Sequence, residues 1–267
     1  MRRFPLVRVL IVALLLAFVP QIASAQSVST SSPPPIRDAQ AIAVLQSAIL
    51  GMGGTQSIAA IQDSTIEGTQ QNPTNPQAAP LTFTWQQSGA EFRDFIQATD
   101  HTYTSLSGHG NPAQQLKGQW SRLNYHVARA NLPFELPALV LYRELENATY
   151  TLHYIGLTTV EGKSALHLRT SDDTDKVGTL VTPQEWYFDP VSFIPIRVEY
   201  RVPYPRNAYQ WTPVSIDYKN YQTQNGVLIP FELDMNPSSG LIVATINSVT
   251  FNSSLSSSLF DPTGGVQ

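Results

Sequence analysis

The segment Tyr218–Asp234, "YKNYQTQNGVLIPFELD", contains two patterns that conflict with each other. Asn225-Gly226 lies between two runs of strand-forming residues, and this dipeptide is the strongest short signal for a β-hairpin. The strand after it, Val227–Phe231, is apolar on both faces and contains Pro230. An antiparallel strand with one wet face alternates apolar and polar residues instead. We therefore expect this strand near the rim of a barrel, covered on one face by the interior and on the other by an N-terminal segment or loop. There Pro230 fits an edge or a bulge.

Other segments of the chain alternate cleanly and predict strands with one buried face. The clearest is "IPIRVEYRV", in which Ile194, Val198 and Val202 face one way and Arg197 and Arg201 the other. Turn signals recur every roughly 8–12 residues, which favours a meander of antiparallel strands. The expected strands are Ser64–Gln70, Leu81–Ser88, Glu91–Ala98, His101–Ser107, Tyr150–Val160, Ser164–Arg169, Glu185–Asp189, Ile194–Val202, Val214–Tyr221, Val227–Asp234 and Leu241–Phe251.

Two segments predict helices. Ala39–Leu50 is amphipathic and follows Asp38, a typical N-cap. The segment "LPFELPALVLYREL" predicts a helix over Phe134–Glu144 that is too apolar for a surface position. The expected fold class is mainly β (α+β). It is an unclosed, strongly curved antiparallel barrel of about eleven strands, with the helices covering its concave apolar face.

The N-terminus predicts export. A basic start, an apolar run and the small-residue site Ala23-Ser24-Ala25 indicate a secretory signal peptide over residues 1–25, too short to span a membrane. We expect a disordered linker over residues 26–37 and a single domain over residues 38–267. The expected location is therefore the periplasm or the exterior.

Composition narrows the classes of partner. The chain has no cysteine, which excludes disulfides, thiolate metal sites and a lipid-anchored N-terminus. Three of its sixteen basic residues and none of its twenty acidic ones lie in the signal peptide, so cleavage changes the formal charge from −4 to −7. Nucleic acid and anionic membrane surfaces are poor partners for such a chain, and we expect no membrane span after cleavage.

Several motifs resemble the periplasmic lipoprotein carriers of the LolA/LolB-like superfamily, which includes outer-membrane lipoprotein-sorting proteins. The stretches that carry the resemblance are "YIGLTTVEGKSALHLRT", "WYFDPVSFIPIRVEY", "VSIDYKNYQTQNGVLIPFELDM" and "ATINSVTFNSSLSSSLFDP", which together span Tyr150–Pro262. The resemblance implies an unclosed barrel with helices as a lid over an apolar cavity. It also implies transport or sensing of lipids or lipoproteins. The matching residues are structural, so no binding residues are transferred from the family.

Motifs of enzymes and metal sites are weak in this sequence. His153 and His167 could be cross-strand neighbours in a hairpin about Gly162, which would suit a metal or an acid–base pair. The aspartates of "SDDTDKVG" do not follow the spacing of a calcium loop, and we interpret them as a solvated hairpin turn. The serines lack the G-x-S-x-G setting of a nucleophile. We expect no cofactor, no metal and no catalytic residue.

Aromatic and aliphatic residues on the expected elements are the candidate ligand-binding set. Large aromatics also dominate ordinary cores, so plain packing is the alternative interpretation. A cavity around the second helix would gain about 0.8 kcal/mol for each buried methylene of an acyl chain. The candidates are Phe83, Trp85, Leu136, Leu139, Val140, Tyr154, Trp186, Phe188, Ile196 and Phe231.

The sequence thus predicts a monomeric, non-catalytic periplasmic carrier of a hydrophobic ligand, either a lipid or the acyl chains of a lipoprotein. Leu136, Leu139 and Val140 would form a lid that moves to release the ligand. The first alternative is an envelope interaction or structural module with a packed barrel and a protein partner. The second is a hydrolase with a dispersed site.

Overall fold

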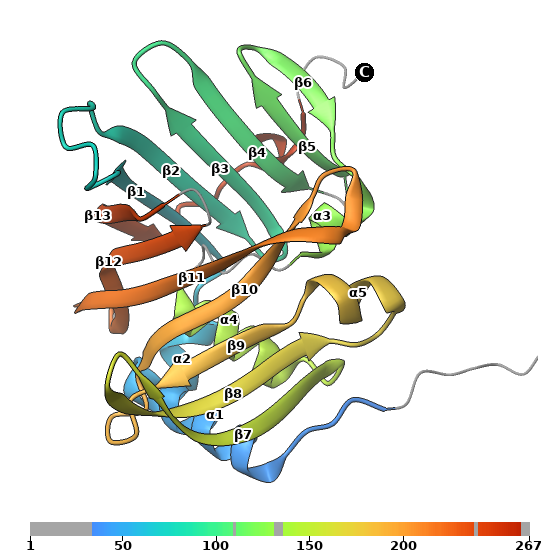
Figure 1. Cartoon of the computed structure of the whole chain (residues 1–267), viewed down its shortest axis with the longest axis vertical. Helices are drawn as coiled ribbons and strands as arrows, with labels where there is room; N and C mark the ends of the chain where they lie inside the picture. Colours follow the sequence, from blue (N-terminus) through green and yellow to red (C-terminus); the bar gives the residue numbers. More distant parts are fainter. Residues whose placement is uncertain (1–33, 109–110, 131–135, 238–239, 263–267) are drawn as a thin grey trace, which may run out of the picture. The chain divides into compact units, whose positions relative to one another are not determined.

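Thirteen strands form one antiparallel sheet whose two edge strands, β6 and β7, do not pair with each other (Figure 1). The computed structural model describes residues 34–108, 111–130, 136–237 and 240–262, and all of them belong to one unit that begins at Ser32. The strands are β1 (Asp63–Gln71), β2 (Leu81–Ser88), β3 (Glu91–Gln97), β4 (Thr102–Gly108), β5 (Asn111–Leu116), β6 (Gln119–Arg122), β7 (Tyr150–Val160), β8 (Lys163–Asp172), β9 (Gln184–Phe188), β10 (Pro195–Tyr204), β11 (Asn207–Gln224), β12 (Val227–Pro237) and β13 (Ile242–Phe251).

The sheet runs in the order β6-β5-β4-β3-β2-β1-β13-β12-β11-β10-β9-β8-β7. Nearly every neighbour in space is also a neighbour in sequence, and the exception is the pairing of β1 with β13. This pairing joins the two ends of the chain in the middle of the sheet. The eleven expected strands are confirmed, and β5 and β6 are additional.

Five α-helices and one 3₁₀ helix accompany the sheet in the described residues, where two helices were expected. Both predicted helices are confirmed. The segment Phe134–Glu144 forms α4, which begins at Pro137, while Phe134 lies outside the described residues. The helices are α1 (Ala39–Gly51), α2 (Gly54–Ala59), α3 (Tyr125–Arg129), α4 (Pro137–Glu146), α5 (Lys176–Val181) and the 3₁₀ helix η1 (Ser257–Phe260). No helix in these ranges is long and apolar enough to cross a membrane.

The core lies between the sheet and helices α1, α2 and α4, around which the sheet curves (Figure 1). Helix α4 is buried on most of its circumference, and Val140 and Leu141 are fully inaccessible to solvent. On the sheet, Leu168, Trp186, Val198 and Ile216 contribute from four neighbouring strands to the same core. The alternation of apolar residues therefore positions one continuous face against the helices.

Asp38 stands at the N-cap position of α1 but does not cap the helix, which differs from the expectation. Its carboxylate instead accepts hydrogen bonds from His153 Nδ1 at 2.6 Å and from the backbone N–H of Tyr154 at 3.0 Å. The preceding Arg37 forms a parallel bridge with Leu152. The start of α1 is thereby fixed to the edge strand β7.

The Asn225-Gly226 turn is confirmed as a two-residue hairpin turn between β11 and β12. Both residues have positive φ, 50° for Asn225 and 81° for Gly226, as a type I′ turn requires. The N–H of Leu228 points away from β11 and donates to the carbonyl of Met52 at 2.9 Å. Pro230 lies two residues further, so its nitrogen also points away from β11.

The short pairing between β12 and β13 explains why β12 can contain Pro230 and apolar residues on both faces. Strand β13 pairs with β12 only over Glu232–Met235, so Pro230 lies beyond the end of that ladder and costs no ladder hydrogen bond. The N-terminal half of β12 is met by the loop after α1. A Cβ on Gly53 would overlap the carbonyl of Gly226. The N-terminal segment therefore covers this edge, as the apolar residues on both faces suggested.

Candidate functional site

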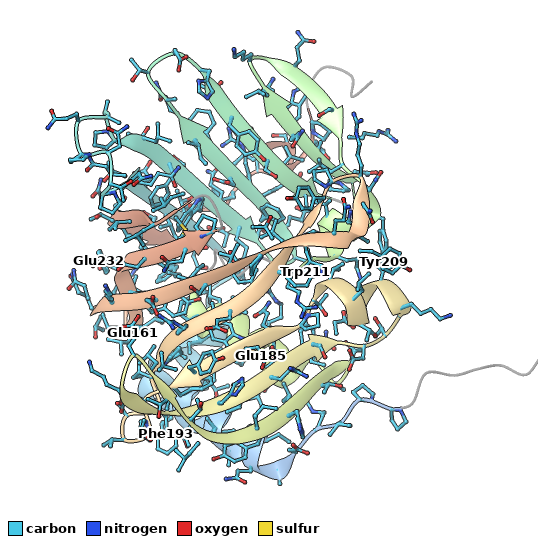
Figure 2. All side chains as sticks on the ribbon, in the orientation of Figure 1. Glu161, Glu185, Phe193, Tyr209, Trp211 and Glu232 are labelled. Atoms are coloured by element: carbon cyan, nitrogen blue, oxygen red, sulfur yellow. The ribbon has the colours of Figure 1, made fainter. Side chains whose placement is uncertain are left out.

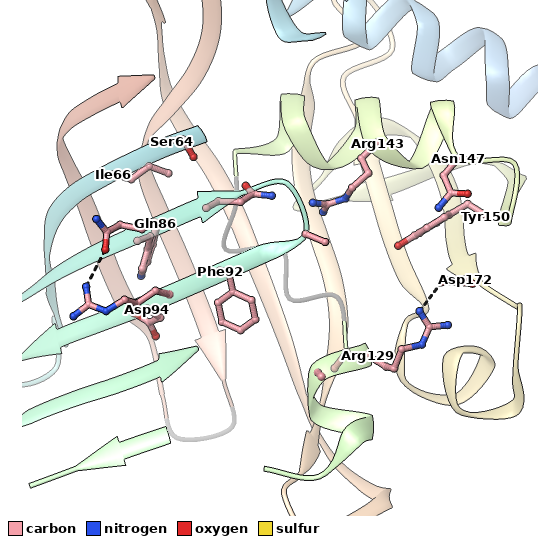
Figure 3. A pocket seen from close by; sticks show the side chains of 16 residues that line it. Ser64, Ile66, Gln86, Phe92, Asp94, Arg129, Arg143, Asn147, Tyr150 and Asp172 are labelled. Carbon is pink, nitrogen blue, oxygen red and sulfur yellow. Dashed lines mark hydrogen bonds and ion pairs between the residues drawn. The ribbon is translucent and has the colours of Figure 1, made fainter. Parts of the chain in front are cut away.

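Two adjoining cavities lie between α4 and the sheet face of β1, β2 and β3 (Figure 3). The larger has a volume of about 260 Å³ and the smaller about 140 Å³. Ser64, Gln87 and Arg143 line both of them, so the two form one continuous candidate site. Ile58, Ile61 and Leu139 make the smaller cavity largely aliphatic, whereas the larger one has both apolar and charged walls.

The sheet wall of the larger cavity is aromatic and aliphatic. Strand pairing places Ile66 opposite Trp85, and Trp85 opposite Asp94. Phe92 follows on the same face of β3. The ring of Trp85 stacks on Phe83 with a centroid separation of 4.0 Å, so its position is fixed from behind. Ile66, Trp85 and Phe92 are therefore the apolar part of this wall.

Asp94 places a carboxyl group on this apolar wall. Its Oδ1 atom is shielded from solvent and has no hydrogen-bond partner among the described residues. Burial raises the pKa of Asp94 to about 7, against the opposing effects of a hydrogen bond from Trp85 and the positive charge of Arg93. The group is therefore close to half protonated at neutral pH, and a ligand could change its state.

The opposite wall carries guanidinium and phenol groups from α3, α4 and β7. Arg129 Nη1 contacts Asp172 Oδ2 at 2.8 Å, and the Arg129 Nη2 group donates to Thr174 Oγ1 at 2.9 Å. Burial raises the pKa of Asp172, but the hydrogen bonds from Arg129 and Thr174 outweigh it and hold that pKa below its ordinary value. Arg143 extends from α4 toward the cavity (Figure 3). Burial also raises the pKa of Tyr150 above its ordinary value, so its hydroxyl stays neutral.

Helix α5 fixes the position of Arg129. Asp175 caps this helix by accepting a hydrogen bond from the N–H of Gly178 at 2.6 Å, and it lies 3.7 Å from Arg129 Nη2. A Cβ on Gly178 would overlap the carbonyl of Asp172 and crowd the guanidinium. The interpretation of "SDDTDKVG" as a hairpin turn was wrong, because these residues end β8 and begin α5.

Of the ten predicted ligand-binding residues, two line this site and eight do not. Trp85 lines the larger cavity and Leu139 the smaller one. Neither cavity is lined by the other eight. Phe83, Leu136, Val140, Trp186 and Phe188 lie in the buried core, and Tyr154 and Phe231 pack against it partly exposed. Ile196 is half-buried at a bulge between β9 and β10.

The hypothesis of a His153–His167 pair is not supported by the register of the hairpin. His153 lies opposite Arg169, and His167 lies opposite Gly156 across a bulge. His153 contacts Asp38, and His167 Nε2 contacts Glu185 Oε2 at 2.7 Å. Within the described ranges, no three histidine, aspartate or glutamate side chains gather closely enough to hold a metal ion.

A broad groove of about 850 Å³ lies on the other face of the sheet, over β7 to β12. Glu185 and Glu199 lie opposite each other in this groove. The guanidinium of Arg201 stacks over Trp211 at 4.0 Å from the ring centroid. Figure 2 shows Glu185 and Trp211 on the face toward the viewer. This groove has more than three times the volume of the larger cavity beneath α4.

Sequence reasoning missed Asp94, Arg129 and Arg143. A signal for Asp94 was available, because it alternates with Phe92 and Ile96 and must share their inward face. Arg129 and Arg143 gave no comparable signal, since the positions of their helices depend on contacts with distant strands.

Comparison with solved structures identifies the fold. A DUF1329 family protein from Desulfovibrio piger superposes with a TM-score of 0.52 at 13% identity, covering 82% of this chain and 96% of that protein. A LolA superfamily protein from Nitrosomonas europaea superposes with a TM-score of 0.51 at 14% identity, covering 83% of this chain and 97% of that protein. A putative outer membrane lipoprotein-sorting protein domain from Vibrio parahaemolyticus superposes with a TM-score of 0.50 at 15% identity, covering 82% of this chain and 95% of that domain.

Neither a family model nor a curated protein sequence matches this chain. The structural similarity nevertheless covers 82–83% of this chain, and the predicted LolA/LolB-like resemblance agrees with it. The chain has the LolA-like fold.

Proposed function

We propose that the protein is a non-catalytic carrier or binding protein for an amphiphilic ligand, whose apolar part enters the site beneath α4. The observation that carries this proposal is the pair of adjoining cavities, lined on the sheet side by Ile66, Trp85 and Phe92 and on the helix side by Leu139 and Arg143 of α4. Burial of about ten methylenes would contribute roughly 8 kcal/mol, which corresponds to a micromolar Kd before the costs of association.

The volume of the larger cavity favours a single chain over several. At about 260 Å³ it falls just below the roughly 300–1,000 Å³ typical of small-molecule sites. A larger ligand would require α4 to move away from the sheet. We propose that Trp85 and Leu139 contact the ligand in the closed state, and that Phe83, Leu136, Val140, Tyr154, Trp186, Phe188, Ile196 and Phe231 become accessible as the lid opens.

We also propose that the protein works in the periplasm or outside the cell as a monomer. The predicted signal peptide supports this location, although it lies outside the described residues. The names of two structural neighbours, a LolA superfamily protein and a lipoprotein-sorting protein domain, are consistent with it. A lipid or lipoprotein acyl chain is the natural ligand class in that compartment.

The test is binding of a fluorescent long-chain fatty acid, combined with native mass spectrometry of the protein from its own periplasm. Trp85 should report binding by quenching of its fluorescence. Trp85→Phe should therefore abolish the quenching, whereas the matched variant Trp211→Phe, in the outer groove, should retain it. A protein of unliganded mass that also takes up no fatty acid would refute the proposal.

A second candidate function is an envelope interaction module, and the exposure of aromatic residues on the β10–β11 hairpin favours it. Tyr209 is 82% exposed, Tyr204 52% and Trp211 38%. Tyr209 and Trp211 lie on this hairpin in Figure 2. This function predicts a protein partner on crosslinking that Tyr209→Ala removes, together with no uptake of fatty acid.

A further inference from the structure

The carboxyl group of Asp94 is not explained by the binding of a purely apolar ligand. Trp85 donates a hydrogen bond to this carboxyl group, but its Oδ1 atom is shielded from solvent and has no hydrogen-bond partner among the described residues. An unpaired polar group inside an apolar wall costs free energy unless something compensates it. Because Asp94 lines the larger cavity, a ligand is in a position to supply that partner.

Aromatic rings surround Asp94 on the same sheet face. Trp85 lies directly opposite in β2, and Phe92 precedes it by two residues in β3. Tyr103 follows on β4, where burial and the charge of Asp94 both raise the pKa of its phenol. A carboxylate among aromatic rings is a favourable environment for an organic cation, because cation–π attraction adds to the ion pair.

The cations near the cavity have other partners or other directions. Arg93 neighbours Asp94 in sequence and also lines the larger cavity, but its guanidinium donates to Gln86 Oε1 at 2.9 Å and lies over the ring of Phe95. Arg129 is held by Asp172. Arg93 is the charged group that lowers the pKa of Asp94, against the larger effect of burial.

We propose that the larger cavity selects an amphiphile with an ammonium group, which pairs with Asp94 against the rings of Trp85 and Phe92. This inference rests on the proposed carrier function and names the ligand class of that same site. The ammonium group would pair with the Asp94 carboxylate, whose side chain would turn to expose Oδ1, and the chain would extend beneath α4 toward the smaller cavity.

The proposal predicts a pH dependence with a definite sign. An ammonium ligand favours the ionised carboxylate, so its affinity should rise with pH through the pKa of Asp94, about 7. The ionised fraction is about 3% at pH 5.5 and about 90% at pH 8. No histidine lines this cavity in the described residues. Arg93 and Arg129 stay charged, the pKa of Asp172 is lowered, and the pKa values of Tyr103 and Tyr150 are raised, so these groups keep their charge states in this window.

The experiment is isothermal titration calorimetry of the full protein with decylammonium, decanol and decanoate, which share one chain length. At pH 8 decylammonium should bind about tenfold more tightly than decanol. Its affinity should fall about tenfold when the pH is lowered to 5.5. Asp94→Asn should remove the preference for decylammonium and its pH dependence, but should leave the affinity for decanol unchanged. The matched control Asp100→Asn removes a carboxylate whose side chain is 81% exposed. This control should change neither the preference for decylammonium nor its pH dependence.

Each outcome decides the proposal. If decanol or decanoate binds but decylammonium shows no preference, the ammonium site is refuted and the carrier function stands. If none of the three binds, both fail. A decylammonium preference that survives Asp94→Asn, or that Asp100→Asn removes, would assign the effect to overall charge and refute the site. Should Asp94→Asn fail to fold, the pH dependence of the wild-type protein still decides.

Discussion

Asp63 is the residue whose removal should most clearly test how the two ends of the chain are joined. It begins β1, is 7% exposed, and lines the smaller cavity. Its carboxylate accepts hydrogen bonds from the N–H groups of Ser253, Ser254 and Leu255 at 2.8, 2.9 and 3.2 Å, and from the Ser253 hydroxyl at 3.1 Å. Asp63→Ala would leave these donors without an acceptor.

The expected cost follows from the number and charge of these bonds. Each hydrogen bond to a charged group contributes about 1.5–3 kcal/mol, and water replaces part of this at the exposed Ser253 and Ser254. We therefore expect Asp63→Ala to lower the free energy of unfolding by about 3 kcal/mol, which corresponds to a decrease in Tm of roughly 6–12 °C for a domain of this size. Asp100→Ala, on the surface, should change stability by less than about 0.5 kcal/mol.

The same residue predicts a pH dependence. Burial raises the pKa of Asp63, but the hydrogen bonds from Ser253, Leu255 and Ser254 more than offset it and lower the pKa below its ordinary value. A carboxyl with a lowered folded-state pKa stabilises the fold above its unfolded pKa of about 3.9, and loses this contribution as pH falls through the folded value. The difference in the free energy of unfolding between the wild-type protein and Asp63→Ala should therefore be largest at pH 7 and decrease in acid.

Urea denaturation followed by circular dichroism, repeated from pH 7 down to the lowest pH at which both proteins stay folded, measures this difference. Asp63→Asn is a useful second variant, because its amide places N–H donors against backbone donors and cannot ionise. A deficit below about 0.5 kcal/mol at pH 7, or one that stays constant into acid, would contradict the reasoning.

Four further substitutions test packing and turn geometry by the same denaturation assay. Gly68→Ala should disrupt the pairing of β1 with β13, because the new Cβ would overlap the carbonyl of Thr245 and the ring of Phe83; an unchanged midpoint would refute this. Phe260→Ala should cost about 3–5 kcal/mol, since Phe260 is fully buried, and should increase proteolysis after β13. Gly226→Val should cost at least about 1 kcal/mol because φ is 81° there, whereas Gly162→Asn, in a similar turn, should cost less.

The strands were predictable because most carry one buried face, which produces a period of two in the sequence. Strands β5 and β6 escaped prediction for a physical reason. Their segment, "NPAQQLKGQWSR", has few apolar residues, and its buried Ala113 is too small to mark an inward face. Helices α3 and α5 have five and six residues, too few to establish a helical period.

The candidate site was only partly predictable. Alternation identified Trp85 as inward-facing, and the unusual hydrophobicity of α4 identified Leu139 and Val140 as part of a covered surface. Alternation cannot distinguish a residue that lines a cavity from one that packs against a neighbour, because both face inward. The distinction depends on how far α4 lies from each strand, which no local pattern encodes.

The position of α4 connects the two cavities and decides what the site can hold. Arg143 lines both of them, and Leu139, one helical turn earlier on α4, lines the smaller. A displacement of this helix must therefore change both volumes together and expose the core residues Val140 and Leu141 on its buried face. Exposing such residues costs roughly 1.5–3 kcal/mol each. Under the proposed carrier function, an empty site would therefore favour the observed position of α4, and a ligand would hold this helix away from the sheet only by replacing these contacts with its own chain.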